Sequence, residues 1–253
     1  SLHDALPISQ ASALRYAPQP PPPQPPPPPR QKGLHRAPAR RAARAGAAIK
    51  ADCYGLGAAA AVPVLAAAGC RDWFVAHWQE AAEAARIVPA DQIAVLHGPI
   101  TDAEAAYGKA LGLRPVLNSL LQVKRWLAAG GGLCDLMVDT GINRLGVSAA
   151  DLGDPLISAL QIDVLMSHLA SAEEPCDLNP QQLQRWQQAR AQVPHARASL
   201  ANSAGIALGV DYHGDLTRPG LSLYGGVPCD ALAGVIRQVV TPQAALMQVR
   251  SIS

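Results

Sequence analysis

Lys50 is the residue whose type and position best suit chemistry. It ends a short apolar run, residues 47–49, and precedes a segment with two glycines, residues 51–57. A lysine amine at the end of a buried strand can lose its proton and form an imine with an aldehyde. A lysine at a strand edge can equally extend its ammonium group into water. This segment alone leaves both interpretations open.

The elements that must position this lysine alternate along the chain. Short strand-like runs predict eight strands, over residues 47–50, 73–76, 93–97, 115–118, 136–139, 164–168, 198–201 and 221–224. Residues 80–87, 102–111, 120–129 and 180–191 predict helices with one apolar face. Parallel strands need such helical crossovers. We therefore expect an α/β fold, a (β/α)8 TIM barrel over residues 47–240. An open doubly wound sheet is the alternative, although no GxGxxG motif follows any strand.

A barrel places its functional groups at the carboxyl ends of its strands. Lys50 ends the first predicted strand, His168 ends the sixth, and Arg144 follows the fifth. Residues 202–205 follow the seventh strand, and residues 218–220 precede the eighth. We therefore expect an amine, two guanidinium groups, an imidazole and two glycine- and serine-containing turns around one opening.

These groups suit an aldehyde that also carries a phosphate. Lys50 can hold the aldehyde. The Ser203 hydroxyl and the backbone amides of Gly220 and Leu221 can bind the phosphate, because small residues allow close approach of the backbone. Pyridoxal 5′-phosphate (PLP) has both groups. Taken singly, each residue has a structural explanation, such as a core histidine or the start of a helix. Their shared position at strand ends favours the PLP site.

Five segments resemble, in order and spacing, the motifs of the alanine racemase family. They are residues 50–57 (KADCYGLG), 139–146 (DTGINRLG), 167–172 (SHLASA), 201–205 (ANSAG) and 218–225 (RPGLSLYG). The resemblance runs from about residue 47 to the C-terminus. It implies a PLP-dependent isomerase that acts as a homodimer, interconverts L- and D-alanine, and supplies D-alanine for peptidoglycan.

The resemblance also implies roles for individual residues. Lys50 would carry PLP and act as the base for the D-enantiomer. The phosphate would be held by Tyr54, Ser203, Gly220 and Leu221.

Two arginines have roles in the same resemblance. Arg218, supported by His168, would face the pyridine nitrogen of PLP. A guanidinium group stays protonated at any relevant pH and can only donate, so the ring nitrogen would stay unprotonated and PLP would be a weaker electron sink. Arg144 would face the phenolic oxygen of the cofactor and the carboxylate of the substrate.

Three departures from the family pattern bear on activity. The family takes its second base, a tyrosine, from an all-β domain of the partner subunit, and here residues 241–253 are expected to be only the start of that domain. We therefore expect weak or absent activity of the chain as given. The strand and helix that precede the lysine strand in the family are replaced by a Pro/Arg-rich segment. Met137 stands where many relatives carry a carbamylated lysine, so Arg144 would need another anionic neighbour or a bound anion.

Residues 1–46 are not expected to form a domain. They hold 12 of the 23 prolines and carry seven basic residues against one acidic residue, a net charge of 7 − 1 = +6. Such a composition predicts polyproline II or disorder. The segment is interpreted as a non-native N-terminus or, alternatively, as a ligand for proline-binding modules, which would make the chain a proline-rich adaptor.

The remaining residues carry 14 basic and 18 acidic side chains, a net charge of −4, which gives no support for nucleic-acid binding. Five widely spaced cysteines without a CxxC pair predict free thiols, a cytoplasmic location and no metal site. No apolar run reaches the roughly 20 residues of a membrane span.

Two further functions stay open: a PLP-binding barrel without strong turnover, and a racemase of another amino acid such as serine.

Overall fold

The computed structural model describes residues 43–241 and 243–252. The chain divides into two units, Ser1–Ala39 and Arg40–Ser253, and all the described residues belong to the second. The predictions for residues 1–42 therefore lie outside the described residues. No helix in the described part has the length and apolar character that crossing a bilayer requires.

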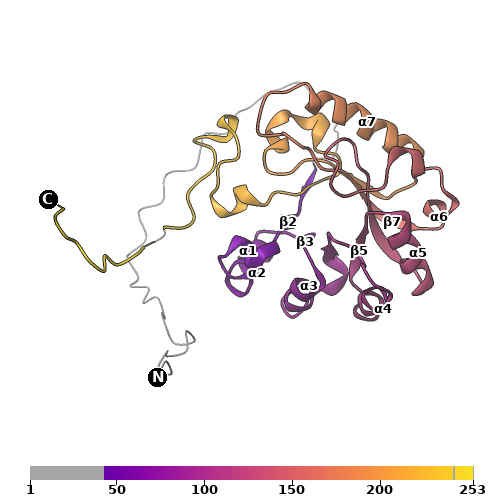
Figure 1. Ribbon diagram of the computed structural model, residues 1–253, viewed down its shortest axis with the longest axis horizontal. Helices are drawn as coiled ribbons and strands as arrows, with labels where there is room; N and C mark the ends of the chain where they lie inside the picture. The colour runs from indigo at the N-terminus through magenta and orange to yellow at the C-terminus, as the bar shows by residue number, and fades with distance from the viewer. Residues whose placement is uncertain (1–42, 242, 253) are drawn as a thin grey trace, which may run out of the picture. The chain divides into compact units, whose positions relative to one another are not determined.

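The second unit contains a curled sheet of seven parallel strands that follow one another in chain order (Figure 1). The strands are β2 (Ala47–Ala48), β3 (Trp73–Val75), β4 (Ile93–Val95), β5 (Arg114–Leu117), β6 (Leu133–Met137), β7 (Gln161–Met166) and β8 (Arg197–Ser199). Seven helices accompany them in the described residues: α1 (Lys50–Tyr54), α2 (Ala58–Ala67), α3 (Trp78–Ala84), α4 (Asp102–Leu111), α5 (Leu120–Ala128), α6 (Pro155–Ser158) and α7 (Leu178–Gln192). The predicted α/β class and the first seven strands are confirmed, with shifted bounds.

Two further strands form a separate parallel pair, β1 (Arg44–Ala45) with β9 (Leu216–Thr217). Backbone hydrogen bonds link this pair to both ends of the seven-stranded sheet. On the β8 side, Asp215 N donates to Ala198 O (2.8 Å). On the β2 side, Ala48 N donates to Pro219 O (2.9 Å). β1 lies within residues 1–46, the segment that was not expected to belong to a folded domain. Its two residues, Arg44 and Ala45, nevertheless pair with β9.

The eighth strand was predicted in the wrong place. The segment Leu221–Tyr224 is a 3-10 helix, η6, and the strand lies five residues earlier, at β9. The Ser203 hydroxyl explains the difference, because it accepts hydrogen bonds from the amides of Gly220 (3.0 Å) and Ser222 (3.2 Å). These two bonds fold the segment around Ser203 and remove the amides from any strand ladder.

Local sequence signals fix the starts of several helices. Thr101 forms a capping box with Glu104 at the start of α4, and the Ser119 hydroxyl accepts from Gln122 N at the start of α5. Helix α2 was not predicted, because Pro63 lies inside it and proline usually ends a helix.

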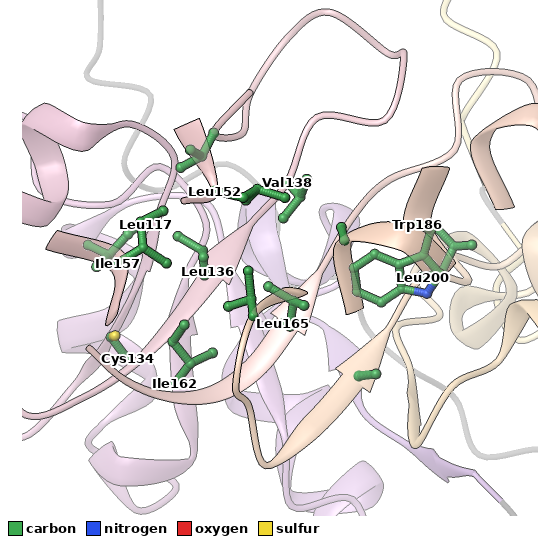
Figure 2. Close-up of a cluster of buried hydrophobic side chains, with 14 of the residues drawn as sticks. Leu117, Cys134, Leu136, Val138, Leu152, Ile157, Ile162, Leu165, Trp186 and Leu200 are labelled. Carbon is green, nitrogen blue, oxygen red and sulfur yellow. The ribbon is translucent and has the colours of Figure 1, made fainter. Parts of the chain in front are cut away.

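The largest apolar core cluster lies between the second half of the sheet and its helices (Figure 2). Leu136 on β6 and Leu165 on β7 are fully buried there, together with Trp186 of α7. The remaining labelled members of the cluster are Leu117, Cys134, Val138, Leu152, Ile157, Ile162 and Leu200. This packing holds β6, β7 and β8 against α5, α6 and α7, the elements that precede or follow three of the candidate site loops.

Charged side chains occupy the amino ends of the strands. Arg114, the first residue of β5, lies 3.0 Å from Asp163 on β7 and 3.6 Å from Asp135 on β6. Arg197, the first residue of β8, pairs with Asp163 (2.6 Å) and with Asp72, which precedes β3 (2.8 Å). We call these five residues the ion cluster. Buried charges are stable only when they are paired in this way.

Asp135 makes the stability of this cluster depend on pH. Its side chain is fully buried, and Oδ2 has no hydrogen-bond partner. Burial is the main cause that raises its pKa to about 6, and the neighbouring Asp163 adds to the rise, while Arg114 opposes it. A raised pKa means that the folded state holds a proton that the unfolded state has already released. The contribution of Asp135 to the free energy of unfolding is therefore present at pH 4 and is lost as the pH rises through 6.

We expect Asp135→Asn to be better tolerated at pH 7 than at pH 4, because asparagine imitates the protonated acid. The difference in unfolding free energy, variant minus wild type, should rise by up to about 1.4 kcal/mol for each unit of pH between 4 and 6. Urea unfolding of both proteins at several pH values measures it. Asp102→Asn, at an exposed pair with Arg125, is the control and should show no such trend. A constant difference for Asp135→Asn would contradict the raised pKa.

Candidate active site

A cavity of about 400 Å³ lies at the carboxyl ends of the strands, and the residues predicted from the sequence line it. All eight predicted residues are present: Lys50, Tyr54, Arg144, His168, Ser203, Arg218, Gly220 and Leu221. They come from five separate segments of the chain, as expected for a site built from loops that follow different strands. The structure thus brings the residues together, while the role of each stays a prediction.

Lys50 begins α1, and the residues after it have an unusual conformation. Ala51, Asp52, Cys53 and Tyr54 all have φ between 51° and 57°, which makes a left-handed turn. Each such residue other than glycine costs roughly 1–2 kcal/mol, so the surroundings must hold the turn. The Asp52 carboxylate accepts from Ala58 N at the start of α2 (2.6 Å), and the Cys53 side chain is fully buried. The turn places both Lys50 and Tyr54 on the cavity.

Ser203 and the segment after Arg218 form one compact turn. The Ser203 hydroxyl lies within 3.2 Å of the amide nitrogens of Gly220 and Ser222 and 3.1 Å from the Ser222 hydroxyl. Gly220 is packed tightly, since a Cβ there would collide with the Tyr54 hydroxyl. Hydroxyl and amide donors that converge in this way suit a phosphate group.

Arg218 is almost fully buried and is fixed from several sides. Its guanidinium donates to the Ser199 hydroxyl and to the carbonyl oxygens of Ser167 and Leu200, and it lies 6.0 Å from the centre of the Phe74 ring. Burial lowers its pKa to about 10, so the group is still charged at neutral pH. The sequence did not identify these partners, because a buried serine on a strand has no distinctive pattern.

His168 lies close to Arg218, but among the described residues no hydrogen bond joins its ring to that arginine. Burial is the main cause that lowers its pKa to about 3, followed by the positive charges of Arg218, Arg144 and Lys50. The histidine is therefore neutral at physiological pH. The hydrogen bonds of Arg218 go to Ser199 and the two carbonyl groups, and support from His168 stays a prediction.

Arg144 lies in the loop after β6, and its side chain is exposed at the cavity. The Asp139 carboxylate shapes this loop by accepting from Gly141 N (2.8 Å) and Asn143 N (3.1 Å). Gly146 is required where the loop closes: its φ is 128°, and a Cβ would collide with the backbone of Asp139.

The family resemblance predicted that Arg144 would need another anionic neighbour or a bound anion, because Met137 stands where the resemblance implies a carbamylated lysine. Met137 is buried and lines the cavity. Glu173, which the sequence did not single out, is the one carboxylate among the described residues that line the cavity. In the described residues, no ion pair within 4 Å joins Glu173 and Arg144. The carboxylate and the guanidinium group therefore both line the cavity without pairing directly.

Gln182 of α7 is a second residue that the sequence analysis missed. Its side chain is fully buried and connects two site loops. Its amide group donates to the Thr140 hydroxyl (3.2 Å) and to His168 O (3.0 Å), and its oxygen accepts from Ala170 N (2.8 Å). A buried glutamine in a glutamine-rich helix gives no signal before its surroundings are known.

The charges around the cavity favour an anionic ligand. Three cationic side chains line it, those of Lys50, Arg144 and Arg218, against the single carboxylate of Glu173. The volume lies in the range of small-molecule sites. An amine beside a converging set of hydroxyl and amide donors can hold a small phosphorylated carbonyl compound at both of its ends.

Comparison with known proteins agrees with this geometry. Residues 34–228 match the family model described as alanine racemase, N-terminal domain. An alanine racemase of Rhizobium meliloti is 43% identical over 220 residues, which are 83% of this chain and 58% of that protein. One of Rhodospirillum rubrum is 44% identical over 81% of this chain and 58% of its own length. The chain thus spans less than two thirds of the length of the curated relatives it matches.

Solved structures give the same result. The alanine racemase of Bartonella henselae, with covalently bound pyridoxal phosphate, matches with a TM-score of 0.68 and 35% identity over 74% of this chain and 58% of that one. The biosynthetic alanine racemase of Pseudomonas aeruginosa matches with a TM-score of 0.71 and 30% identity over 78% of this chain and 57% of that one. By these matches, the chain belongs to the family of alanine racemase N-terminal domains.

Proposed function

We propose that this chain binds PLP in the cavity, with Lys50 as the point of covalent attachment, and that it serves the interconversion of L- and D-alanine for peptidoglycan synthesis. The observation that carries the proposal is the convergence of Lys50 and the Ser203–Gly220 turn on one cavity. The names of the relatives support alanine over serine and a racemase over a PLP carrier without turnover.

We propose further that the fold is a closed (β/α)8 barrel with β9 in the eighth position. The support comes from the backbone hydrogen bonds that lead from β8 through residues 215–219 to β1 and β2. Closure would bring Lys50, after β2, beside Arg218, after β9. The assignment of residues 241–253 to a following β domain stays a prediction.

The residues present fit PLP. A phosphate would take the place of intramolecular contacts at the amides of Gly220 and Ser222, with the Ser203 and Tyr54 hydroxyl groups beside it. The three cationic side chains would offset the negative charge of the phosphate and of a substrate carboxylate. When it is bound, PLP supplies an electron sink for the charge that develops as the α-proton leaves.

The surrounding side chains have distinct tasks in this proposal. The Lys50 amine removes or returns the α-proton on one face of the substrate. Arg218 stays charged and only donates, so it cannot protonate a ring nitrogen placed against it. His168 stays neutral because its pKa is depressed to about 3, and it therefore adds no further charge beside the arginine. Arg144, on an exposed loop, binds the substrate carboxylate.

Racemisation also needs a proton carrier on the opposite face of the substrate. Of the tyrosines in the described residues, only Tyr54 lines the cavity, and it lies on the same turn as Lys50. We propose that the second carrier is a tyrosine of another subunit in a homodimer. The cytoplasmic location stays a prediction from the cysteine usage.

Absorbance titration of the full chain with PLP tests the proposal. Binding should produce a band above 400 nm, and reduction with borohydride should fix the cofactor to Lys50, which peptide mapping by mass spectrometry locates. Conversion of L-alanine to D-alanine is then measured with a D-amino-acid-specific coupled assay. A protein that folds and shows no such band with PLP would contradict the proposal.

Gly220→Ala should weaken PLP binding at least tenfold. The added methyl group would collide with the Tyr54 hydroxyl and crowd Ala48, so either Tyr54 or the turn around Ser203 would have to move out of its place beside the phosphate. Gly153→Ala is the matched control, because a Cβ at Gly153 meets no atom within 4 Å. The same absorbance titration compares the two. Equal dissociation constants for both variants would argue against a phosphate site at Gly220.

A further inference from the structure

We propose that Glu80 is a positioning residue for Lys50: its carboxylate holds the left-handed turn after the lysine and so fixes where the amine enters the cavity. The inference deepens the proposed function and rests on it, since it assumes that Lys50 is the attachment point. Glu80 does not line the cavity itself, so it acts through the backbone.

The contacts of Glu80 join two site segments. It is the third residue of α3, far from Lys50 in sequence, and its side chain is only 15% exposed. One carboxylate oxygen, Oε1, accepts from Ala51 N at 2.6 Å, and the other, Oε2, accepts from Ala76 N at 2.7 Å. The carboxylate therefore bridges the chain just after β2 to the chain just after β3.

The Ala51 amide is the group through which Lys50 can be held most directly. It belongs to the peptide plane that starts at the Cα atom of Lys50, so holding this N–H fixes the direction in which the backbone leaves the lysine. The same residue, Ala51, is the first of the left-handed turn, with a φ of 51°. A charge-assisted hydrogen bond at this point is stronger than one between neutral groups.

Two acceptor oxygens are needed at once, and only a carboxylate provides them. A glutamine in the same place has one oxygen and an NH2 group, which would face an amide donor. His77 is another titratable group beside Glu80, with Nε2 3.7 Å from Oε1 and a side chain that is half exposed. His77 lies beside the same oxygen, Oε1, that accepts from Ala51 N. The hydrogen bonds from Ala51 N and Ala76 N are both formed in its presence.

The test compares Glu80→Gln with Glu83→Gln in the full chain. Glu83 lies on the same helix and is exposed, and among the described residues its carboxylate accepts a hydrogen bond only from Gln79 Nε2 (3.4 Å). We expect Glu80→Gln to weaken PLP binding about tenfold and to reduce borohydride-fixed label at Lys50, while Glu83→Gln behaves as wild type. Equal PLP affinity and labelling in Glu80→Gln and wild type would overturn the inference.

A second readout does not depend on PLP. Limited acetylation, with peptide mass spectrometry, gives the reactivity of Lys50 relative to the exposed Lys124 of α5. This ratio should change at least threefold in Glu80→Gln and stay constant in Glu83→Gln. If the wild type fails to bind PLP, the proposed function fails, and the acetylation ratio still decides whether Glu80 controls the amine.

Rescue by glycine separates positioning from general stability. Glycine adopts positive φ without the penalty of a Cβ, so Ala51→Gly should restore most of the PLP affinity and the acetylation ratio when combined with Glu80→Gln. A defect of Glu80→Gln that Ala51→Gly leaves unchanged would show that the carboxylate acts elsewhere, for example only at Ala76, and would also overturn the inference.

Discussion

Lys50→Ala should abolish covalent attachment of PLP, with no label recovered after borohydride reduction. The alanine keeps the backbone and removes the only lysine amine among the described residues that line the cavity. Because Ser203, Gly220 and Arg218 are untouched, the variant should still bind PLP reversibly and more weakly, with the absorbance of the free aldehyde. Absorbance spectra before and after reduction, followed by peptide mapping, measure both effects.

Lys124→Ala is the control for this experiment, since Lys124 is exposed on α5 and does not line the cavity. It should be labelled as fully as wild type. Any D-alanine formation by the wild type should also disappear in Lys50→Ala and persist in Lys124→Ala. Recovery of the label at a different lysine in the wild type would refute the assignment of Lys50.

Arg114→Met should destabilise the fold by about 3–5 kcal/mol, the usual cost of removing one partner from a buried group of charges. Methionine fills much of the space but leaves Asp135 and Asp163 without the cation at β5. Urea unfolding followed by circular dichroism measures the loss. Arg125→Met is the matched control: its pair with Asp102 is exposed at the acid (3.2 Å), so we expect a loss of about 0–1 kcal/mol.

The pH dependence of the same experiment identifies the cause. Asp135, whose pKa is raised to about 6, takes up a proton as the pH falls below that value, so the loss in Arg114→Met should be smaller at pH 4 than at pH 7. If the loss were the same at both pH values, packing at Arg114 would be responsible and the ion cluster would contribute little to stability.

Most of the strands and helices could be predicted because their signals are local. The apolar runs of β2 to β8 and the capped starts of α4 and α5 lie within a few residues of one another in sequence. β9 was not predicted, because Leu216 and Thr217 lie between the charged Asp215 and Arg218 and form no apolar run, unlike the equally short β2. The pattern of Leu221–Tyr224 resembles a strand, yet the contact that folds it comes from Ser203, on another segment.

The convergence of the candidate site could also be predicted, because parallel strands that alternate with helices bring their carboxyl ends to one side. The geometry within the site could not. The left-handed turn after Lys50 contains no glycine from Ala51 to Tyr54, so the sequence of this segment does not predict its positive φ angles. The hydrogen bonds of Arg218 to Ser199 and of Gln182 to Thr140 depend on residues that are distant in sequence.

The ion cluster lies toward the amino ends of the strands, and the cavity lies at their carboxyl ends. The two are therefore at opposite ends of the same strands. Substitutions that are far apart and share no partner usually have additive effects on stability. Exposed residues of the cavity loops, such as Arg144, can therefore change without disturbing the charges that secure the scaffold. The buried Arg218 is different, because the charge of Asp135 in the ion cluster raises its pKa. Changes in the outer loops and retention of the architecture are thus separable, whereas changes at Arg218 are not.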